Sequence, residues 1–318
     1  MNRRRFFVVS AAPFVGIGGC GRKEAIGPPV AFDAAAFERR QTFLVDRQTY
    51  RIAPTSTFTT PKPATNVPDL LPELKGLSKV VIRLHPRYSA TPKESESKLG
   101  GQFLWPADEP WPTYSQTKFP YQPILQLRAD DAPPNFAFLP GTDLLQLLWC
   151  PHRELFPIIA WRKSSAVGSE LATIPEVKVG TVDVIPAECR LFPERVVEYP
   201  GIDILPESVR SKIKDPASYE RTLSVASGTK VGGYPRGLKP GDDTSCPKCL
   251  KVTDFLLTID QNEWTDESKS RWMPVEEQGK PALPNHAGLQ FGKSFGHVHL
   301  FICRRCDGWP IRHVNQAD

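Results

Sequence analysis

The fold of this chain is decided by two Cys-x-x-Cys stretches, Cys246-Pro-Lys-Cys249 and Cys303-Arg-Arg-Cys306. Two residues between cysteines let a tight turn aim both sulfurs at one ion, as tetrahedral zinc requires. The first pair immediately precedes an apolar stretch, 253–259, and the second immediately follows another, 297–302. If these stretches are antiparallel neighbouring strands, the two pairs meet at one end of a sheet. The sequence therefore predicts a four-cysteine zinc site of the zinc-ribbon type.

Four thiolate ligands leave no open coordination position for water, so this zinc is expected to be structural rather than catalytic. The 53 residues between Cys249 and Cys303 make an unusually long loop, compared with about 15–20 in most such sites. Two alternatives stay open for the quartet. The cysteines form structural disulfides or a redox pair, as an oxidising compartment would allow, or they are unrelated to one another.

Two further cysteines lie outside the pairs. Cys150, in the stretch Cys150-Pro-His152, follows the stretch 145–148, which resembles the stretch 298–301 that precedes Cys303. Cys150 is therefore a candidate remnant of a second metal-binding turn. A buried thiol, or a disulfide between Cys150 and Cys189, is the stronger interpretation, and the sequence does not decide between them.

Strand patterns dominate the chain after residue 78. Apolar and β-branched runs predict strands at 80–84, 124–127, 144–149, 157–161, 182–185, 189–198, 253–259 and 297–302. Helical patterns are confined to 34–47 and to 206–224, which Pro216 interrupts. Proline makes up 33 of 318 residues, about twice the usual share, which disfavours long helical bundles. The predicted fold class is α+β and β-rich.

The chain also repeats itself. Lys98-Leu-Gly-Gly101 recurs as Lys230-Val-Gly-Gly233, and the stretch 124–127 recurs at 256–259 with the same offset of 132 residues. Two motifs in constant register predict an internal duplication, with halves at about 78–200 and 201–318 and the cysteine pairs in the second half.

These motifs carry a family resemblance. The stretch 97–101, two Trp-Pro pairs beginning at Trp105 and Trp111, and the stretch 123–127 resemble the front half of the YwqG-like family, a bacterial domain of unknown function; 229–235 and 255–260 resemble its rear half. The resemblance spans about 78–306. It implies a β-rich α+β fold, no established catalytic residues, and a binding or immunity role. The N-terminus and the cysteine pairs depart from the family pattern.

The N-terminus is typical of an exported protein. Arg3 and Arg4 precede Arg5-Phe-Phe7, a pattern that resembles the twin-arginine motif. The apolar run that follows is about 20 Å long as a helix, too short to cross a bilayer core of about 30 Å. The stretch 17–20 resembles a lipobox, which would make Cys20 the lipidated first residue of the mature chain. A cytosolic protein with a basic start is the alternative.

These signals predict three segments: an export signal at 1–19, a tether with a helix and a Pro-rich loop at 20–77, and the duplicated domain at 78–318. The twin-arginine route carries folded proteins, so zinc would be loaded before export. Three of the 40 basic residues lie in 1–19, which leaves 37 against 35 acidic residues in the mature chain. A net charge of +2 and export both argue against nucleic acid as a partner.

His297 and His299 are the strongest candidates for catalysis. On a strand their side chains share one face, where they could bind a second metal or supply a general base. No assembled catalytic set accompanies them. The sequence therefore predicts an exported, lipid-anchored and zinc-stabilised binding module for an unknown protein or envelope ligand. The alternative is an exported metal-dependent hydrolase that uses His297, His299 and an acid such as Asp260.

Overall fold

The computed structural model describes residues 55–88, 91–152, 154–177, 182–279, 287–293 and 295–317, together with Ala35, Glu38 and Ala53. The predicted export signal with Arg3 and Arg4, and the predicted lipidation site Cys20, lie outside the described residues. In the part of the chain that is described, no helix has the length and apolar character needed to cross a membrane.

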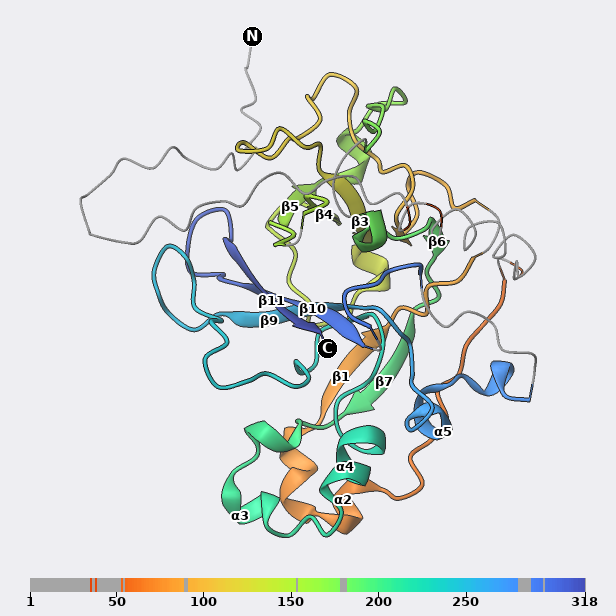
Figure 1. Ribbon diagram of the computed structural model, residues 1–318, viewed down its shortest axis with the longest axis vertical. Coiled ribbons are helices and arrows are strands. Elements are labelled where there is room, and N and C mark those ends of the chain that lie inside the picture. Colours follow the sequence, from red (N-terminus) through yellow and green to blue (C-terminus); the bar gives the residue numbers. More distant parts are fainter. Residues whose placement is uncertain are drawn as a thin grey trace.

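The protein is built on two antiparallel sheets (Figure 1). The six-stranded sheet has the order β11 (Ile311–Ala317), β10 (Gly296–Ile302), β9 (Asp254–Asp260), β8 (Lys230–Val231), β1 (Lys79–Arg83) and β7 (Glu194–Glu198). The five-stranded sheet has the order β5 (Ile158–Arg162), β4 (Leu144–Trp149), β3 (Gln122–Arg128), β2 (Lys98–Leu99) and β6 (Cys189–Arg190). The predicted β-rich α+β class is confirmed.

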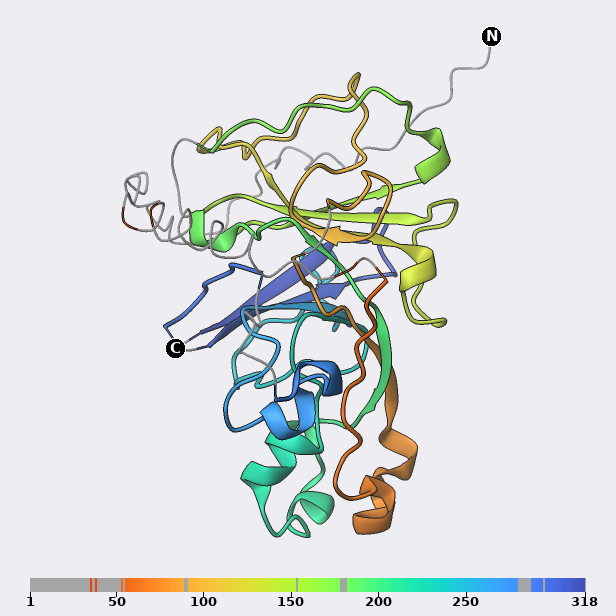
Figure 2. The ribbon, with the colours of Figure 1, turned by 90° about the vertical axis from the view of Figure 1, so that its right-hand side faces the viewer.

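The main core lies between the two sheets, which form stacked layers in Figure 2. Leu125 and Leu147 from one sheet and Leu257 and Leu300 from the other are fully buried in it. All six residues of β4 are buried because both of its faces are covered, and all but Gln146 are apolar. Its outer face packs on an aromatic cluster that includes Trp105, so the sandwich extends beyond the inter-sheet core.

Short helices gather at one end of the six-stranded sheet (Figure 1). They are α2 (Val67–Leu70), η1 (Pro72–Leu77), α3 (Glu207–Arg210) and α4 (Pro216–Thr222), which share a small apolar core, and α5 (Lys269–Trp272) lies against α4. The remaining one-turn 3-10 helices are η2 (Ala129–Asp131), η3 (Ser164–Ala166), η4 (Val182–Val184), η5 (Ile202–Ile204) and η6 (Val275–Glu277). The predicted break of the second helical stretch at Pro216 is confirmed.

Two predicted strands need correction. The stretch 182–185 is wrong as a strand, because Val182–Val184 forms the 3-10 turn η4, just before Pro186. The stretch 189–198 is two strands, β6 and β7, in different sheets. Pro193 lies between them and has no N–H to continue a ladder. The edge strand β11 was not predicted, because its sequence is largely polar.

The two sheets contain strands in matching order. β2-β3-β4-β5 and β8-β9-β10-β11 are both antiparallel meanders, and each begins with a two-residue strand followed by a glycine pair. All four of these glycines, Gly100, Gly101, Gly232 and Gly233, have positive φ. β1 and β7, which precede residue 200, complete the six-stranded sheet, so the sequence halves do not coincide with the two sheets.

We expect Gly233→Ala to lower the free energy of unfolding by about 3 kcal/mol. Gly233 has φ 81°, and a Cβ there would overlap the buried carboxylate of Glu198, which three partners hold in place. Gly237→Ala is the matched control, because Gly237 has φ 66° and open space around it. It should cost only about 1 kcal/mol. Urea unfolding measures both; equal losses would contradict this explanation.

Candidate metal centre

The two cysteine pairs meet because β9 and β10 are antiparallel neighbours. Ile302, at the end of β10, pairs with Asp254, at the start of β9. The first pair lies just before β9 and the second just after β10, as the sequence predicted. The two turns therefore face each other at one end of the sheet.

Backbone hydrogen bonds fix the first turn. The N–H of Cys246 donates to the carbonyl of Lys251 (2.8 Å), and the N–H of Leu250 donates to the carbonyl of Cys246 (2.9 Å). The N–H of Lys248 lies 3.3 Å from Cys246 Sγ. These bonds close the turn and bring Cys249 onto the same side as Cys246.

The second turn is closed in the same way. The N–H of Cys303 donates to the carbonyl of Pro310 (2.9 Å), and the N–H of Trp309 donates to the carbonyl of Cys306 (3.1 Å). Two arginines tie this turn to the first: Arg304 pairs with Asp254 (3.0 Å), and Arg305 donates to the carbonyl of Val252.

The four sulfurs form one compact group. Cys246 Sγ lies 3.9 Å from Cys306 Sγ, and Cys249 Sγ lies 3.7 Å from Cys303 Sγ. All four sulfurs are within 4.8 Å of one another. Tetrahedral zinc with bonds of about 2.3 Å gives a sulfur–sulfur edge of about 3.8 Å, whereas a disulfide needs about 2.05 Å. The quartet is therefore compatible with one metal ion and is not arranged as disulfides.

The electrostatics of the quartet favour a bound cation. The backbone N–H of Lys251 lowers the pKa of Cys249 to about 6, whereas burial raises the pKa of Cys306 to about 12. Thiolates this close repel one another, so the four cannot all ionise unless a cation neutralises them. Within the described residues, this quartet is the one group of His, Cys, Asp and Glu side chains able to hold a metal ion.

The first half carries the same turn without the metal ligands. The N–H of Tyr114 donates to Phe119 (2.8 Å), and the N–H of Lys118 donates to Tyr114 (2.8 Å). These bonds match those of the Cys246 turn at an offset of 132, so Tyr114 and Thr117 stand where the second half has Cys246 and Cys249. Cys150 follows β4 as Cys303 follows β10. The rings of Tyr114 and Phe156 are stacked with their centres 4.3 Å apart, so aromatic packing stabilises this turn.

Cys150 and Cys189 are fully buried thiols, and they do not form the disulfide that the sequence left open. Burial raises the pKa of Cys150 to about 11. A thiol of this kind is unreactive at neutral pH.

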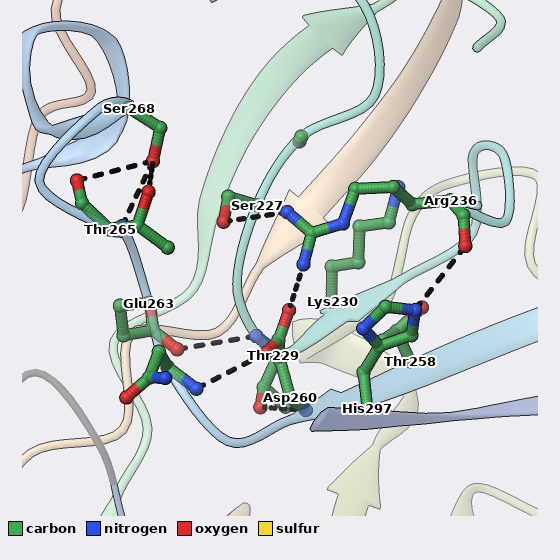
Figure 3. Close-up of polar contacts among 12 residues, drawn as sticks. Ser227, Thr229, Lys230, Arg236, Thr258, Asp260, Glu263, Thr265, Ser268 and His297 are labelled. Atoms are coloured by element: carbon green, nitrogen blue, oxygen red, sulfur yellow. Dashed lines mark hydrogen bonds and ion pairs between the residues drawn. The ribbon is translucent and has the colours of Figure 1, made fainter. Parts of the chain in front are cut away.

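His297 and His299 lie on one face of β10, as predicted, but both are buried. Both hold the backbone of Arg236. The carbonyl oxygen of Arg236 lies 3.3 Å from His297 Nε2 (Figure 3) and 2.8 Å from His299 Nε2. His299 Nδ1 lies 2.9 Å from the Thr258 hydroxyl. Asp260 forms an ion pair with Arg236 at 3.0 Å. These side chains organise the loop that carries Arg236, and His297, His299 and Asp260 are buried beneath it.

The pH dependence of stability should report this burial. Burial, assisted by the Arg236 charge, lowers the pKa of His297 to about 3, whereas an unfolded histidine titrates near about 6.5. Below pH 6.5 the unfolded state therefore binds a proton that the native state does not. We expect His297 to reduce the free energy of unfolding by about 2 kcal/mol between pH 7 and pH 5.

His297→Gln should remove that part of the slope in urea unfolding with zinc in excess. The partly exposed His152 is the control, and His152→Gln should keep the slope of the parent protein. The same slope in His297→Gln would show that His297 titrates normally in the folded protein.

A buried ion pair escaped the sequence analysis. Lys230 Nζ lies 2.6 Å from Glu198 Oε2, and both side chains are at most 1% exposed. The Glu198 carboxylate also accepts hydrogen bonds from the N–H groups of Ala226 (2.7 Å) and Tyr234. Burial lowers the pKa of Lys230 to about 8 and raises that of Glu198, and each partner opposes the shift of the other.

A second buried cluster lies on the face of β1 away from the inter-sheet core. The bases and acids that pair in it are Arg83 with Glu263 (3.8 Å), His85 with Glu194 (2.8 Å) and Arg87 with Glu277 (2.8 Å). Burial raises the pKa of Glu263 to about 7. The alternation Arg83-Leu-His85-Pro-Arg87 was the available signal, because it places three basic side chains on one face.

No family model and no curated protein matches this chain.

Proposed function

We propose that the protein is a binding module held together by one structural zinc ion, without catalytic activity. The observation that carries this proposal is the closed set of four sulfurs within 4.8 Å of one another. Cys246, Cys249, Cys303 and Cys306 would supply all four ligands of a tetrahedral ion, which leaves no position for a substrate or a reactive water. Soft thiolate ligands in this geometry suit zinc.

The buried histidines support a non-catalytic role. His297 is 4% exposed and His299 is fully buried, and both engage the Arg236 backbone. A hydrolase would need one of these rings to reach a water or a substrate. We therefore favour the binding module over the hydrolase that the sequence left as its alternative.

Metal content and thiol reactivity test the proposal together. We expect one zinc per chain, with the four sulfurs inert to a thiol reagent until a chelator is added. The full chain should also show no hydrolysis of ester, amide or phosphate substrates that depends on His297. A second exchangeable metal, or turnover abolished by His297→Ala with zinc retained, would overturn the proposal.

We further propose that the protein is exported by the twin-arginine route and anchored through Cys20 to the bacterial envelope. The support is the order of a basic start, an apolar run and the stretch 17–20. An alkyne fatty-acid probe should label the full chain in bacteria, and Cys20→Ala should abolish the label. Labelling that survives this change would count against the anchor.

The matched meanders support our proposals of an internal duplication and of kinship with the YwqG-like family. If the turn at Tyr114 is a copy that lost its ligands, Tyr114→Cys/Thr117→Cys should bind a second metal ion, with Cys150 and His152 completing the site. Cobalt titration should then rise from one to two ions per chain. A stoichiometry that stays at one would show that the two turns differ in geometry.

A further inference from the structure

A cleft of about 660 Å³ opens where the glycine pair of the second half meets the other sheet. Its floor comes from the start of β1, from β7, from Gly232 and Gly233, and from Phe255 of β9. Its wall is the loop 133–137, which follows β3 of the five-stranded sheet. A Cβ on Gly232 would lie 3.4 Å from the ring of Pro133, so this glycine lies directly beside the loop of the other sheet.

The lining of the cleft is cationic. Lys79, Arg195 and Arg304 line it, and none of the described acidic side chains does. Arg195 is exposed, and no ion pair within the described part of the chain engages it. The nearest buried acid is Glu198, behind Gly233, and Lys230 already neutralises it. The charge of Arg195 is therefore available to a ligand, whereas Arg304 pairs with Asp254 and Lys79 Nζ donates to the carbonyl oxygen of Gly233.

The cations are held beside apolar surface. The Nζ of Lys79 lies 3.9 Å from the centre of the Tyr234 ring. The guanidinium carbon of Arg304 lies 5.4 Å from the centre of the Trp309 ring. Arg304 also forms an ion pair with the largely exposed Asp254. Phe136 and Phe255 are half-buried in the lining, so each leaves ring surface for a ligand. The cleft thus offers positive charge and flat apolar walls together.

Arg304 also lies between two cysteines of the metal centre, Cys303 and Cys306. The turn that the metal would hold closed is therefore the same turn that presents this guanidinium to the cleft. Resting on the proposed binding function, we propose that the cleft binds a small organic anion. Its phosphate or carboxylate group would face Arg195 and Arg304, and its apolar body would contact Phe136 and Phe255.

Titration calorimetry on the metal-loaded protein tests this with three probes: phenyl phosphate, inorganic phosphate and benzyl alcohol. Phenyl phosphate should bind at least tenfold more tightly than either of the others, because it alone combines charge and ring. Arg195→Gln, which changes no cysteine, and Phe255→Leu should each weaken phenyl phosphate binding about tenfold. Arg210→Gln on the exposed helix α3 should leave it unchanged.

The outcomes separate this inference from the proposed function. One zinc per chain with phenyl phosphate binding no tighter than inorganic phosphate, or unaffected by Arg195→Gln, would overturn the cleft proposal alone. Phenyl phosphate binding that is lost in Arg195→Gln, in a protein without stoichiometric metal, would support the cleft and overturn the zinc module. Vesicles containing phosphatidic acid distinguish the source: competition by them indicates a lipid headgroup, and its absence indicates a soluble anion.

Discussion

Cys303→Ser should abolish stoichiometric metal binding and lower the free energy of unfolding by at least about 4 kcal/mol, the largest effect of any single substitution that we expect. Cys303 is buried at the end of β10, and its sulfur lies 3.7 Å from that of Cys249. Loss of one ligand opens the site, and the binding energy of a structural zinc is also folding energy. The loop between the two pairs would then lose its closure.

Elemental analysis and urea unfolding, with and without a chelator, measure this result. Cys150→Ser is the matched control, because Cys150 is a buried thiol that follows β4 as Cys303 follows β10. It should keep one metal per chain and should remain sensitive to the chelator. A Cys303→Ser protein with full metal content and parental stability would show that the quartet is not the metal site.

Glu198→Leu should destabilise the protein by about 4 kcal/mol, because it leaves the ammonium of Lys230 buried without its counter-charge. The variant also removes the acceptor of two backbone N–H groups, those of Ala226 and Tyr234. Lys230→Met should cost about 3 kcal/mol for the same reason, applied to the remaining carboxylate.

The double variant Glu198→Leu/Lys230→Met separates the pair from its surroundings. Its loss should fall at least about 2 kcal/mol short of the sum of the single losses, because neither charge is then buried alone. Glu73 supplies an exposed comparison, since it pairs with Lys212 at the surface, and Glu73→Leu should cost less than about 1 kcal/mol. Strictly additive single losses would mean that the two charges do not act as a pair.

The convergence of the four cysteines could be predicted because the information for it is local. Each cysteine pair specifies its own turn, and each turn is attached to a strand whose apolar run is visible in the sequence. One assumption, that β9 and β10 are antiparallel neighbours, was enough to bring the turns together, and the structure confirms it. The face shared by His297 and His299 was predictable for the same reason, since it follows from the strand period of two.

The buried charges could not be predicted because their partners are remote. Glu198 and Lys230 lie on β7 and β8, which both pair with β1 rather than with each other. No feature of either segment predicts that a lysine before a glycine pair is buried. The structural role of His297 and His299 could not be predicted for a related reason. It depends on Arg236, which lies in a loop about 60 residues away in the sequence.

The edge strand β11 shows the limit of periodicity. Polar residues lie on both of its faces, His313 and Asn315 on one and Arg312 and Gln316 on the other, so its seven residues alternate too weakly to predict a strand. β1 and β7 show a different limit. The sequence predicted a strand at each place. Their position in the six-stranded sheet, however, depends on long-range pairing, such as that of Val81 with Val196.

X-ray absorption at the zinc edge of the purified protein tests the central claim most directly. The account predicts one zinc per chain with four sulfur neighbours at about 2.3 Å and no nitrogen or oxygen ligand. A protein that purifies without metal and fails to take up zinc would contradict the account. So would a zinc ion with nitrogen or oxygen among its direct ligands, because the site would then be open or would lie elsewhere.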